Sequence, residues 1–431
     1  MSRFIQLHML TSYPPSNPNR DDLGRPKTAI MGGTQRMRIS SQSLKRAWRT
    51  SEIFEDALVG FKGVRTKEMG VQIRKAILSG KPLAEHLKDP DMKIIMPEDK
   101  KIYTETSERA FQIARVFVDK IGKNSDEEQD SEEEPTEDVE QDKPEDDNVT
   151  EKKKGNKSQK NGVKKSNIDK NTLKSEQIVF YTPEDIDNIQ ILINNHAAPS
   201  EDDLKSLISA ECSGADVAMF GRMLANAPGK NIEAAVQVAH AITVHTVAIE
   251  DDYFTAVDDL NRGKVDAGSA FLSEAEFSAG LFYSYICINK DLLIKNLNGR
   301  KDISEMTIAA LIETASKIAP SGKQNSFANR VRTSYILAEK GDDQPRSLSV
   351  AYLKPVHSND FQKEAIENLL LTVFEMDKAY GDSNTQRKAF ISNRTEIVRK
   401  IDQNDKLKPF ETELKKIEHD TLSNLISFAK E

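Results

Sequence analysis

The chain has 431 residues, of which 30% are charged, and its formal net charge is −8. No apolar run approaches the length of about 20 residues that a membrane-spanning helix needs. The N-terminus lacks the apolar core of a signal peptide, and its two cysteines, Cys212 and Cys287, fit neither a disulfide framework nor a zinc site. These features predict a cytoplasmic protein without cofactor, metal or membrane contact, and the length predicts two or three structural units.

The charge is unevenly distributed along the chain. Residues 126–147 hold 14 acids and one lysine, residues 152–165 hold seven lysines and no acid, and the rest of the chain carries a net charge of only −2. Around these blocks, Gly122–Glu176 has almost no large apolar residue and cannot bury enough surface to offset the entropy of ordering, which predicts disorder. The segment is either a tolerated insertion in a surface loop or a lysine-rich contact for nucleic acid.

The first predicted elements are two strands and a helix. Arg3–Leu10 alternates apolar and polar residues, which is the pattern of a half-buried strand. After a loop, Arg36–Ile39 alternates cations with apolar residues, so its two arginines are expected on one face and its two apolar residues in the core. Ser40 or Ser41 then offers an N-cap oxygen to a helix that runs to about Glu52.

Helical and extended patterns alternate along the rest of the chain. Helices are predicted within 66–121 and at 182–195, 200–210, 302–318, 360–380 and 409–430. Strands are predicted at 234–247, 280–288, 330–338 and 348–353, and a protruding hairpin or loop at 248–273. Strands interleaved with helices, with short antiparallel returns, predict an α+β fold in which helices cover one sheet.

The most informative part of the sequence is the basic segment 19–49. It holds eight cations and only two acids, and the cations are Arg20, Arg25, Lys27, Arg36, Arg38, Lys45, Arg46 and Arg49. On the predicted helix Lys45 and Arg49 lie on one side with Arg46 beside them, opposite an apolar stripe with Leu44 and Trp48. A strand, a capped turn and a helix that present cations together predict a site for a nucleic-acid phosphate backbone. A solvated basic face is the alternative.

Several motifs, in order, resemble the CasC-type backbone subunit of the type I-E CRISPR surveillance complex, Cascade. They are the block NRDD…GG…R-x-R-I-S-S-Q-S-L-K-R-A, the GRM motif at 221–223, AHAITVHTV…DDYFTAVDDL at 239–260 and EFSAGLFYSYICIN at 276–289. The resemblance covers essentially the whole chain apart from the charged segment. It implies a modified RRM or ferredoxin-like palm (1–55 and 233–431), a helical fingers region (56–232, with 122–176 disordered) and a thumb hairpin (248–275).

The resemblance also implies a binding protein rather than an enzyme. Several copies would line up along one guide crRNA as a helical filament, together with other Cascade subunits. Each copy would displace one base at regular intervals and leave the remaining bases to pair with target DNA. Sequence readout is then left to base pairing, while the protein contacts phosphate and sugar.

The same resemblance implies roles for single residues. The sugar-phosphate backbone would be held by Arg20, Ser40, Gln42, Lys45, Arg46 and Arg49, and the charge pattern adds Lys27, Arg36 and Arg38. Met223 would place apolar surface beside the displaced base, whereas the residue type alone suits a core methionine equally. Phe254, Thr255 and Val257 would contact the kinked RNA from the neighbouring copy, or Phe254 would anchor the hairpin. The GKQNSF loop (322–327) would add two backbone contacts, Lys323 and Gln324.

Two other classes remain open from the residues alone. A metal-dependent RNA nuclease would draw its ligands from Asp251, Asp252, Asp258 and Asp259, or from His240 and His245. The two histidines are five residues apart, so a strand directs them to opposite faces and they cannot share one ion. A stand-alone RNA-binding regulator would bind short RNA as a monomer without forming arrays.

Overall fold

A computed structural model describes residues 2–92, 100–121, 173–175, 177–195, 207–209, 212–224, 227–256, 271–381, 384–401 and 403–431. Three predictions lie wholly or largely outside the described residues: disorder of the charged segment, the helix at 200–210 and the tip of the hairpin with Val257. At the end of the charged segment, Leu173 and Ser175 are buried. The boundary predicted for the disorder, at residue 176, is therefore wrong.

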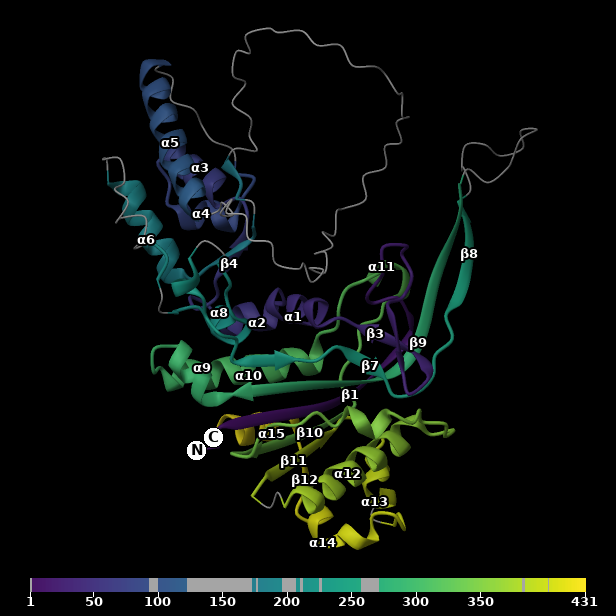
Figure 1. Cartoon of the computed structure of the whole chain (residues 1–431). Coiled ribbons are helices and arrows are strands. Elements are labelled where there is room, and N and C mark those ends of the chain that lie inside the picture. Colours follow the sequence, from purple (N-terminus) through teal and green to yellow (C-terminus); the bar gives the residue numbers. More distant parts are fainter. Residues whose placement is uncertain are drawn as a thin grey trace, which may run out of the picture.

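A ten-stranded mixed sheet forms the centre of the molecule (Figure 1). Its main path is, in spatial order, β12 (Glu418–Asp420), β11 (Gln386–Ile391), β10 (Tyr335–Gly341), β1 (Phe4–Ser16), β9 (Phe271–Asn289), β7 (Ala241–Thr243), β3 (Thr34–Ile39) and β2 (Thr28–Met31). Two further strands, β6 (Val236–Val238) and β8 (Glu250–Ala256), also pair with β9. Paired strands are antiparallel except β11 and β12, which run parallel.

The first strand, β1, is buried on both faces because an apolar core packs against each side of the sheet. Ile5, Leu7 and Met9 pack into the core on one face. On the other face the polar residues Gln6 and His8 are also buried, at 5% and 0% exposure. The prediction of a half-buried strand is therefore wrong, and these polar side chains need hydrogen-bond partners inside the protein.

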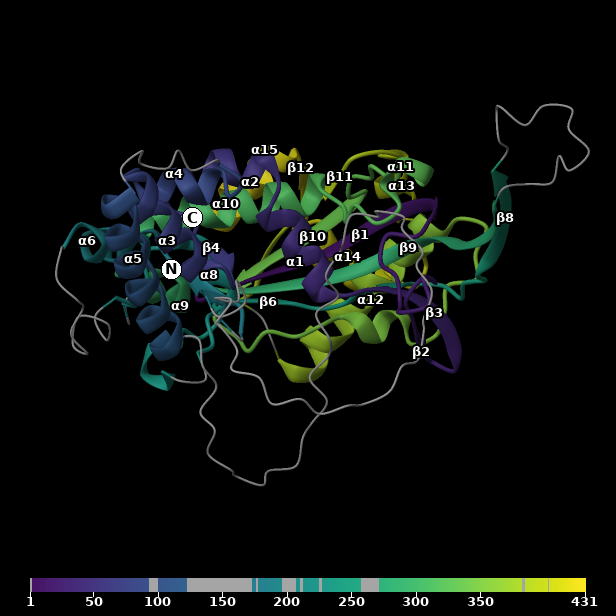
Figure 2. The ribbon, with the colours of Figure 1, turned by 90° about the horizontal axis from the view of Figure 1, so that it is seen from above.

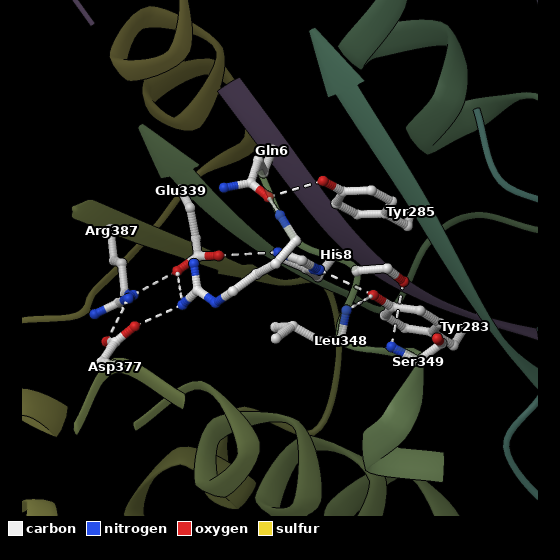
Figure 3. Close-up of polar contacts among 11 residues, drawn as sticks. Gln6, His8, Tyr283, Tyr285, Glu339, Leu348, Ser349, Asp377 and Arg387 are labelled. Carbon is white, nitrogen blue, oxygen red and sulfur yellow. Dashed lines mark hydrogen bonds and ion pairs between the residues drawn. The ribbon is translucent and has the colours of Figure 1, made fainter. Parts of the chain in front are cut away.

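A buried polar network supplies those partners (Figure 3). The His8 Nε2 and Nδ1 atoms lie 3.0 Å from Glu339 Oε2 and 3.0 Å from the Tyr283 hydroxyl, respectively. Burial lowers the pKa of His8, so the neutral ring donates to the carboxylate and accepts from the tyrosine. Burial by itself would raise the pKa of Glu339, but the His8 hydrogen bond and the charges of Arg387 and Arg346 lower it to about 2.

The network also fixes a segment that leads toward the basic region. The backbone N–H of Arg346 donates to Gln6 Oε1 at 2.8 Å, and the N–H of Leu348 donates to the Tyr283 hydroxyl at 3.1 Å. These two bonds hold residues 346–348 against the sheet. The 3-10 helix η3 (Ser349–Tyr352) follows directly.

The predicted covering of the sheet by helices is confirmed, and the helices lie on both of its faces (Figure 1). One face carries α1 (Ser41–Arg49), α2 (Glu52–Ala57), α9 (Lys290–Asn296), α10 (Lys301–Lys317) and α15 (Leu422–Lys430). The other face carries η3, α12 (Phe361–Tyr380), α13 (Glu396–Ile401), η4 (Lys408–Phe410) and α14 (Glu411–Leu414). Each face has its own apolar core, so the α+β class holds in this general form.

A helical lobe with a third apolar core lies at one end of the sheet. It comprises β4 (Val64–Thr66), α3 (Met69–Ser79), α4 (Leu83–Lys88), α5 (Lys100–Ile121), β5 (Val179–Tyr181) and α6 (Pro183–Asn194). Helix α8 (Ala215–Phe220) connects the lobe to the sheet, and η2 (Pro228–Lys230) follows. Figures 1 and 2 place the lobe and the β8–β9 hairpin at opposite ends of the molecule.

Most predicted elements are present with shifted ends, and three predictions are wrong. The strand expected at 348–353 is the 3-10 helix η3, the strand expected from 330 begins only at Tyr335, and β12 interrupts the helix expected at 409–430. The single strand expected at 234–247 is divided into β6 and β7, while β11 and α13 were not predicted. The strand at 280–288 and the helices at 182–195, 302–318 and 360–380 are confirmed.

Candidate nucleic-acid interface

The predicted strand, cap and helix of the basic segment are confirmed. The Ser40 side chain accepts from the Ser43 N–H at 3.3 Å and caps α1. The Ser40 N–H donates to Asn19 Oδ1 at 2.8 Å, which ties the preceding loop to the start of the helix. Leu44 and Trp48 are 5% and 2% exposed and hold α1 on the sheet. The helix ends at residue 49, and α2 begins at residue 52.

Arg36 lies on the same strand as Arg38, as predicted, but it is not an exposed cation. Its side chain is fully buried. The guanidinium donates to Thr34 Oγ1 at 2.9 Å, to the Thr243 carbonyl at 2.8 Å and to the Tyr352 carbonyl at 3.0 Å. Burial lowers its pKa. Arg36 therefore joins β3 to β7 and η3, and its predicted RNA contact is withdrawn.

Arg49, unlike Lys45 and Arg46, is paired with an acidic side chain among the described residues. Its Nε donates to Asp216 Oδ2 at 2.6 Å, and a second guanidinium nitrogen donates to the Gly63 carbonyl at 2.9 Å. The Asp216 carboxylate is fully buried and also accepts from the Gly63 N–H at 2.8 Å. The Phe180 ring centre lies 4.9 Å from the guanidinium carbon. Arg49 is therefore a clamp between α1 and the helical lobe.

On α1, Arg46 is exposed and Lys45 is half-buried. In the described part of the chain, no acidic side chain forms an ion pair with either of them. Lys45 Nζ lies 5.7 Å from the Phe220 ring centre, and its pKa is lowered by burial and then by the charge of Arg65. Gln42 is exposed on the same helix. Cations without acidic partners favour an anion at this surface.

Arg65 was missed by the sequence reasoning. It lies on β4, outside the basic segment, and its guanidinium carbon is 5.2 Å from the Phe180 ring centre. An arginine between Val64 and Thr66 carries no local signal. Its nearness to α1 is evident only in the folded protein, where its charge lowers the pKa of Lys45.

Arg20 and Lys27 lie in one loop beside β3. The backbones of Arg20 and Pro26 form an isolated β-bridge, and the Lys27 N–H donates to the Asn19 carbonyl at 2.9 Å. The Arg38 N–H in turn donates to the Lys27 carbonyl at 2.7 Å. The loop is thus ordered against the strand that leads into α1.

The GKQNSF loop packs against the same N-terminal loop. A Cβ at Gly322 would collide with the carbonyl of Pro18, so only glycine allows this close approach. Lys323 adopts a left-handed backbone conformation with φ of 48°, and the short helix α11 (Gln324–Phe327) follows. The structure therefore brings Lys323 and Gln324 to the side of the loop that carries Arg20. The RNA contacts of Lys323 and Gln324 remain predictions.

The GRM motif combines a turn, an anchor and an exposed side chain. Gly221 has a φ of +81°. Arg222 is buried and donates to Asp185 Oδ2 at 2.8 Å. Met223 is 78% exposed, so the alternative of a core methionine is wrong. Its contact with a displaced base remains a prediction.

The predicted hairpin is present. Strand β8 pairs with the first part of β9, and Phe254 lies opposite Ser273. Tyr253 and Phe254 are 61% and 42% exposed, and Thr255 is also exposed. The roles of Phe254 and Thr255 in contacting RNA remain predictions.

The candidate nuclease ligands do not converge in the described part of the chain. No group of three potential metal ligands occurs among the described residues; Asp251 and Asp252 are exposed on β8, and Asp258 and Asp259 lie outside those residues. His240 Nδ1 accepts from Arg38 at 2.8 Å. The His245 Nε2 accepts from the Leu281 N–H at 3.1 Å, as expected of a hydrogen-bonded core histidine. Burial lowers the pKa of His245.

Solved structures with this fold belong to RNA-guided complexes. A chain of a "CRISPR RNA-guided surveillance complex, pre-nicking" matches with a TM-score of 0.70 and 24% identity, over 99% of this chain and 100% of that chain. A chain of a "CRISPR RNA-guided surveillance complex" matches with a TM-score of 0.53 and 20% identity, over 99% of both chains. At these identities the likeness concerns the fold. No curated protein matches the sequence.

The sequence pattern of the CT1975-like protein family matches residues 5–417. The chain therefore belongs to this CRISPR-associated family, the CasC-type family that its motifs resemble. No helix of the described chain is long and apolar enough to cross a lipid bilayer.

Proposed function

We propose that this chain is a guide-binding backbone subunit of a Cascade-type surveillance complex, and that it acts without catalysis. The observation that carries the proposal is a pair of cations, Lys45 and Arg46, that have no acidic partner among the described residues and lie on a capped helix whose apolar side is fixed on the sheet. Such cations fix the path of the RNA backbone, while sequence is left to base pairing with target DNA. Membership of the CasC-type family supports the same role.

The parts of the fold correspond to a hand. The sheet with its helices is the RRM-related palm (1–55 and 233–431), the helical lobe is the fingers region (56–232) and the β8–β9 hairpin is the thumb (248–275). Support comes from the separate apolar core of the lobe and from the hairpin that projects at the opposite end (Figure 2).

Several copies line up along one guide in this proposal. The hairpin of one copy meets a different surface on the next, and such a heterologous contact repeats as an open helical filament. Exposed apolar side chains at both ends of the molecule support this arrangement: Met223 beside the lobe, and Tyr253 and Phe254 on the hairpin. Met223 would then lie against a displaced base, with Phe254, Thr255 and Val257 of the neighbouring copy at the kink.

The test is loading of the full chain onto a repeat-spacer transcript, measured as native mass after co-expression. We expect the double charge reversal K45E/R46E to abolish loading. The matched control, K378E/K416E, reverses two exposed lysines of α12 and of the segment after α14, on the opposite face of the sheet, and should load like the wild type. Equal loading of K45E/R46E and wild type would refute the proposal.

A further inference from the structure

We propose that Arg65 is a further phosphate-binding residue of the guide site, supplied by the helical lobe rather than by the basic segment. The inference rests on the proposed function. It adds a residue from the two-stranded sheet of β4 and β5, whereas β3 belongs to the central sheet and leads into α1. The RNA backbone would then contact the palm and the lobe together at the point where they meet.

Arg65 lies close to α1 because the Phe180 ring contacts both Arg65 and Arg49 of α1. Strands β4 and β5 pair so that Arg65 lies opposite Phe180. The Phe180 ring centre is 5.2 Å from the Arg65 guanidinium carbon and 4.9 Å from that of Arg49. Because Arg49 is clamped to Asp216, the ring is fixed from the α1 side. Arg65 therefore has a defined position beside α1, although its residue is exposed to solvent.

The charges that act on the pKa of Arg65 are those of two other cations, Arg49 and Arg46. The pKa of Arg65 is lowered by burial, then by the charges of Arg49 and Arg46, and Arg65 in turn lowers the pKa of Lys45. The nearby Asp216 is already occupied by Arg49 and by the Gly63 N–H. Among the described residues no acid forms an ion pair with Arg65, Arg46 or Lys45.

Three cations without an acidic partner repel one another in the isolated protein. Like charges close together cost free energy, and this cost disappears when an anion binds between them. A phosphate oxygen suits the site because a guanidinium offers paired donors to it. Backbone phosphates of single-stranded RNA are the anions that the proposed function delivers to α1. The positions of Arg65, Arg46 and Lys45 therefore favour one shared stretch of RNA backbone.

The alternative is that Arg65 only covers Phe180. Arg300 provides a matched case, because its guanidinium carbon lies 5.3 Å from the ring centre of Phe61. Removing Arg300 also removes a cation from an aromatic ring, but in a pair to which neither α1 nor β4 contributes. If Arg65 is only a cover for its ring, R65Q and R300Q should behave alike in RNA binding.

The experiment measures binding of the full-length chain to a single-stranded guide transcript and to a uridine homopolymer of equal length, over a series of salt concentrations. Each phosphate contact to a single strand contributes about 0.7 to the slope of log affinity against log salt, which is about a fivefold loss near 0.1 M salt. We expect R65Q to lose this amount on both RNAs, R65K to retain most of it, and R300Q to retain all of it.

An unchanged salt slope in R65Q would overturn the inference, as would an equal loss in R300Q. Gln keeps a planar group at position 65, so R65Q is expected to fold normally. R65K keeps the positive charge and tests whether that charge is what binds RNA. The variant K45E/R46E is measured alongside. If it loses binding while R65Q does not, only the role of Arg65 fails; if neither loses binding, the proposed function fails.

Discussion

The substitution R49Q separates the two readings of the basic helix. If Arg49 were an RNA ligand, its loss would weaken binding and leave folding intact. The structure predicts the opposite, because its guanidinium satisfies a fully buried carboxylate on Asp216 and is itself only 15% exposed. After substitution that carboxylate keeps the Gly63 N–H, at 2.8 Å, as its remaining hydrogen bond within the clamp.

The magnitude follows from the contacts that are lost. Removing one partner of a buried ion pair costs about 3–5 kcal/mol, since the other charge stays buried. The hydrogen bond from Arg49 to the Gly63 carbonyl adds about 1 kcal/mol. Because such terms overlap, we expect the free energy of unfolding to fall by about 4 kcal/mol. The double variant R49Q/D216N should lose less than the sum of its single variants.

Trp48 offers a direct assay. It is the single tryptophan of the sequence, lies on α1 beside Arg49 and is 2% exposed. Its fluorescence during urea unfolding therefore reports whether α1 stays packed. The control R46Q should change stability by less than about 0.5 kcal/mol, because Arg46 is exposed, yet weaken RNA binding. Wild-type stability of R49Q, combined with an RNA defect like that of R46Q, would refute this reasoning.

Three further predictions follow from other parts of the molecule. Burial lowers the pKa of His8 below 6.5, so the unfolded chain binds a proton that the folded chain does not. Urea unfolding should show the free energy of unfolding falling below about pH 6.5, by up to about 1.4 kcal/mol per pH unit, with a shallower fall in H8Q. A left-handed alanine costs about 1–2 kcal/mol, and G32A in the β2–β3 turn should cost more, because its Cβ would overlap the Leu353 carbonyl. A Cβ at Gly33 has open space, so G33A should show the conformational cost alone. Thermal unfolding compares the two variants. Y253A/F254A should leave binding of a short RNA unchanged and prevent growth of arrays on a long guide, as sized by native mass; equal array growth would contradict the hairpin contact.

Much of the site's local structure could be read from the sequence. The strand at 36–39, the N-cap at Ser40 and the apolar stripe with Leu44 and Trp48 depend on neighbours within a few residues, and the structure contains all three. The order of the motifs was likewise sufficient to indicate the family, which the match over 5–417 confirms. Each of these features is fixed by short-range periodicity or by residue identity, both of which a linear sequence carries.

Which cations face solvent was decided by the tertiary structure alone. Arg36 finds carbonyls 207 and 316 residues away along the chain, and Arg49 finds a carboxylate 167 residues away. Distant segments also placed Gln6 and His8 in the interior, because η3 and α12, more than 300 residues away along the chain, cover their face of the sheet. A guanidinium in a periodic pattern binds whichever acceptors the fold brings to it, and those acceptors lie far beyond any local window. The sequence therefore determined the helix and the family of the protein, while the distant partners determined which cations of the basic segment are engaged inside the protein.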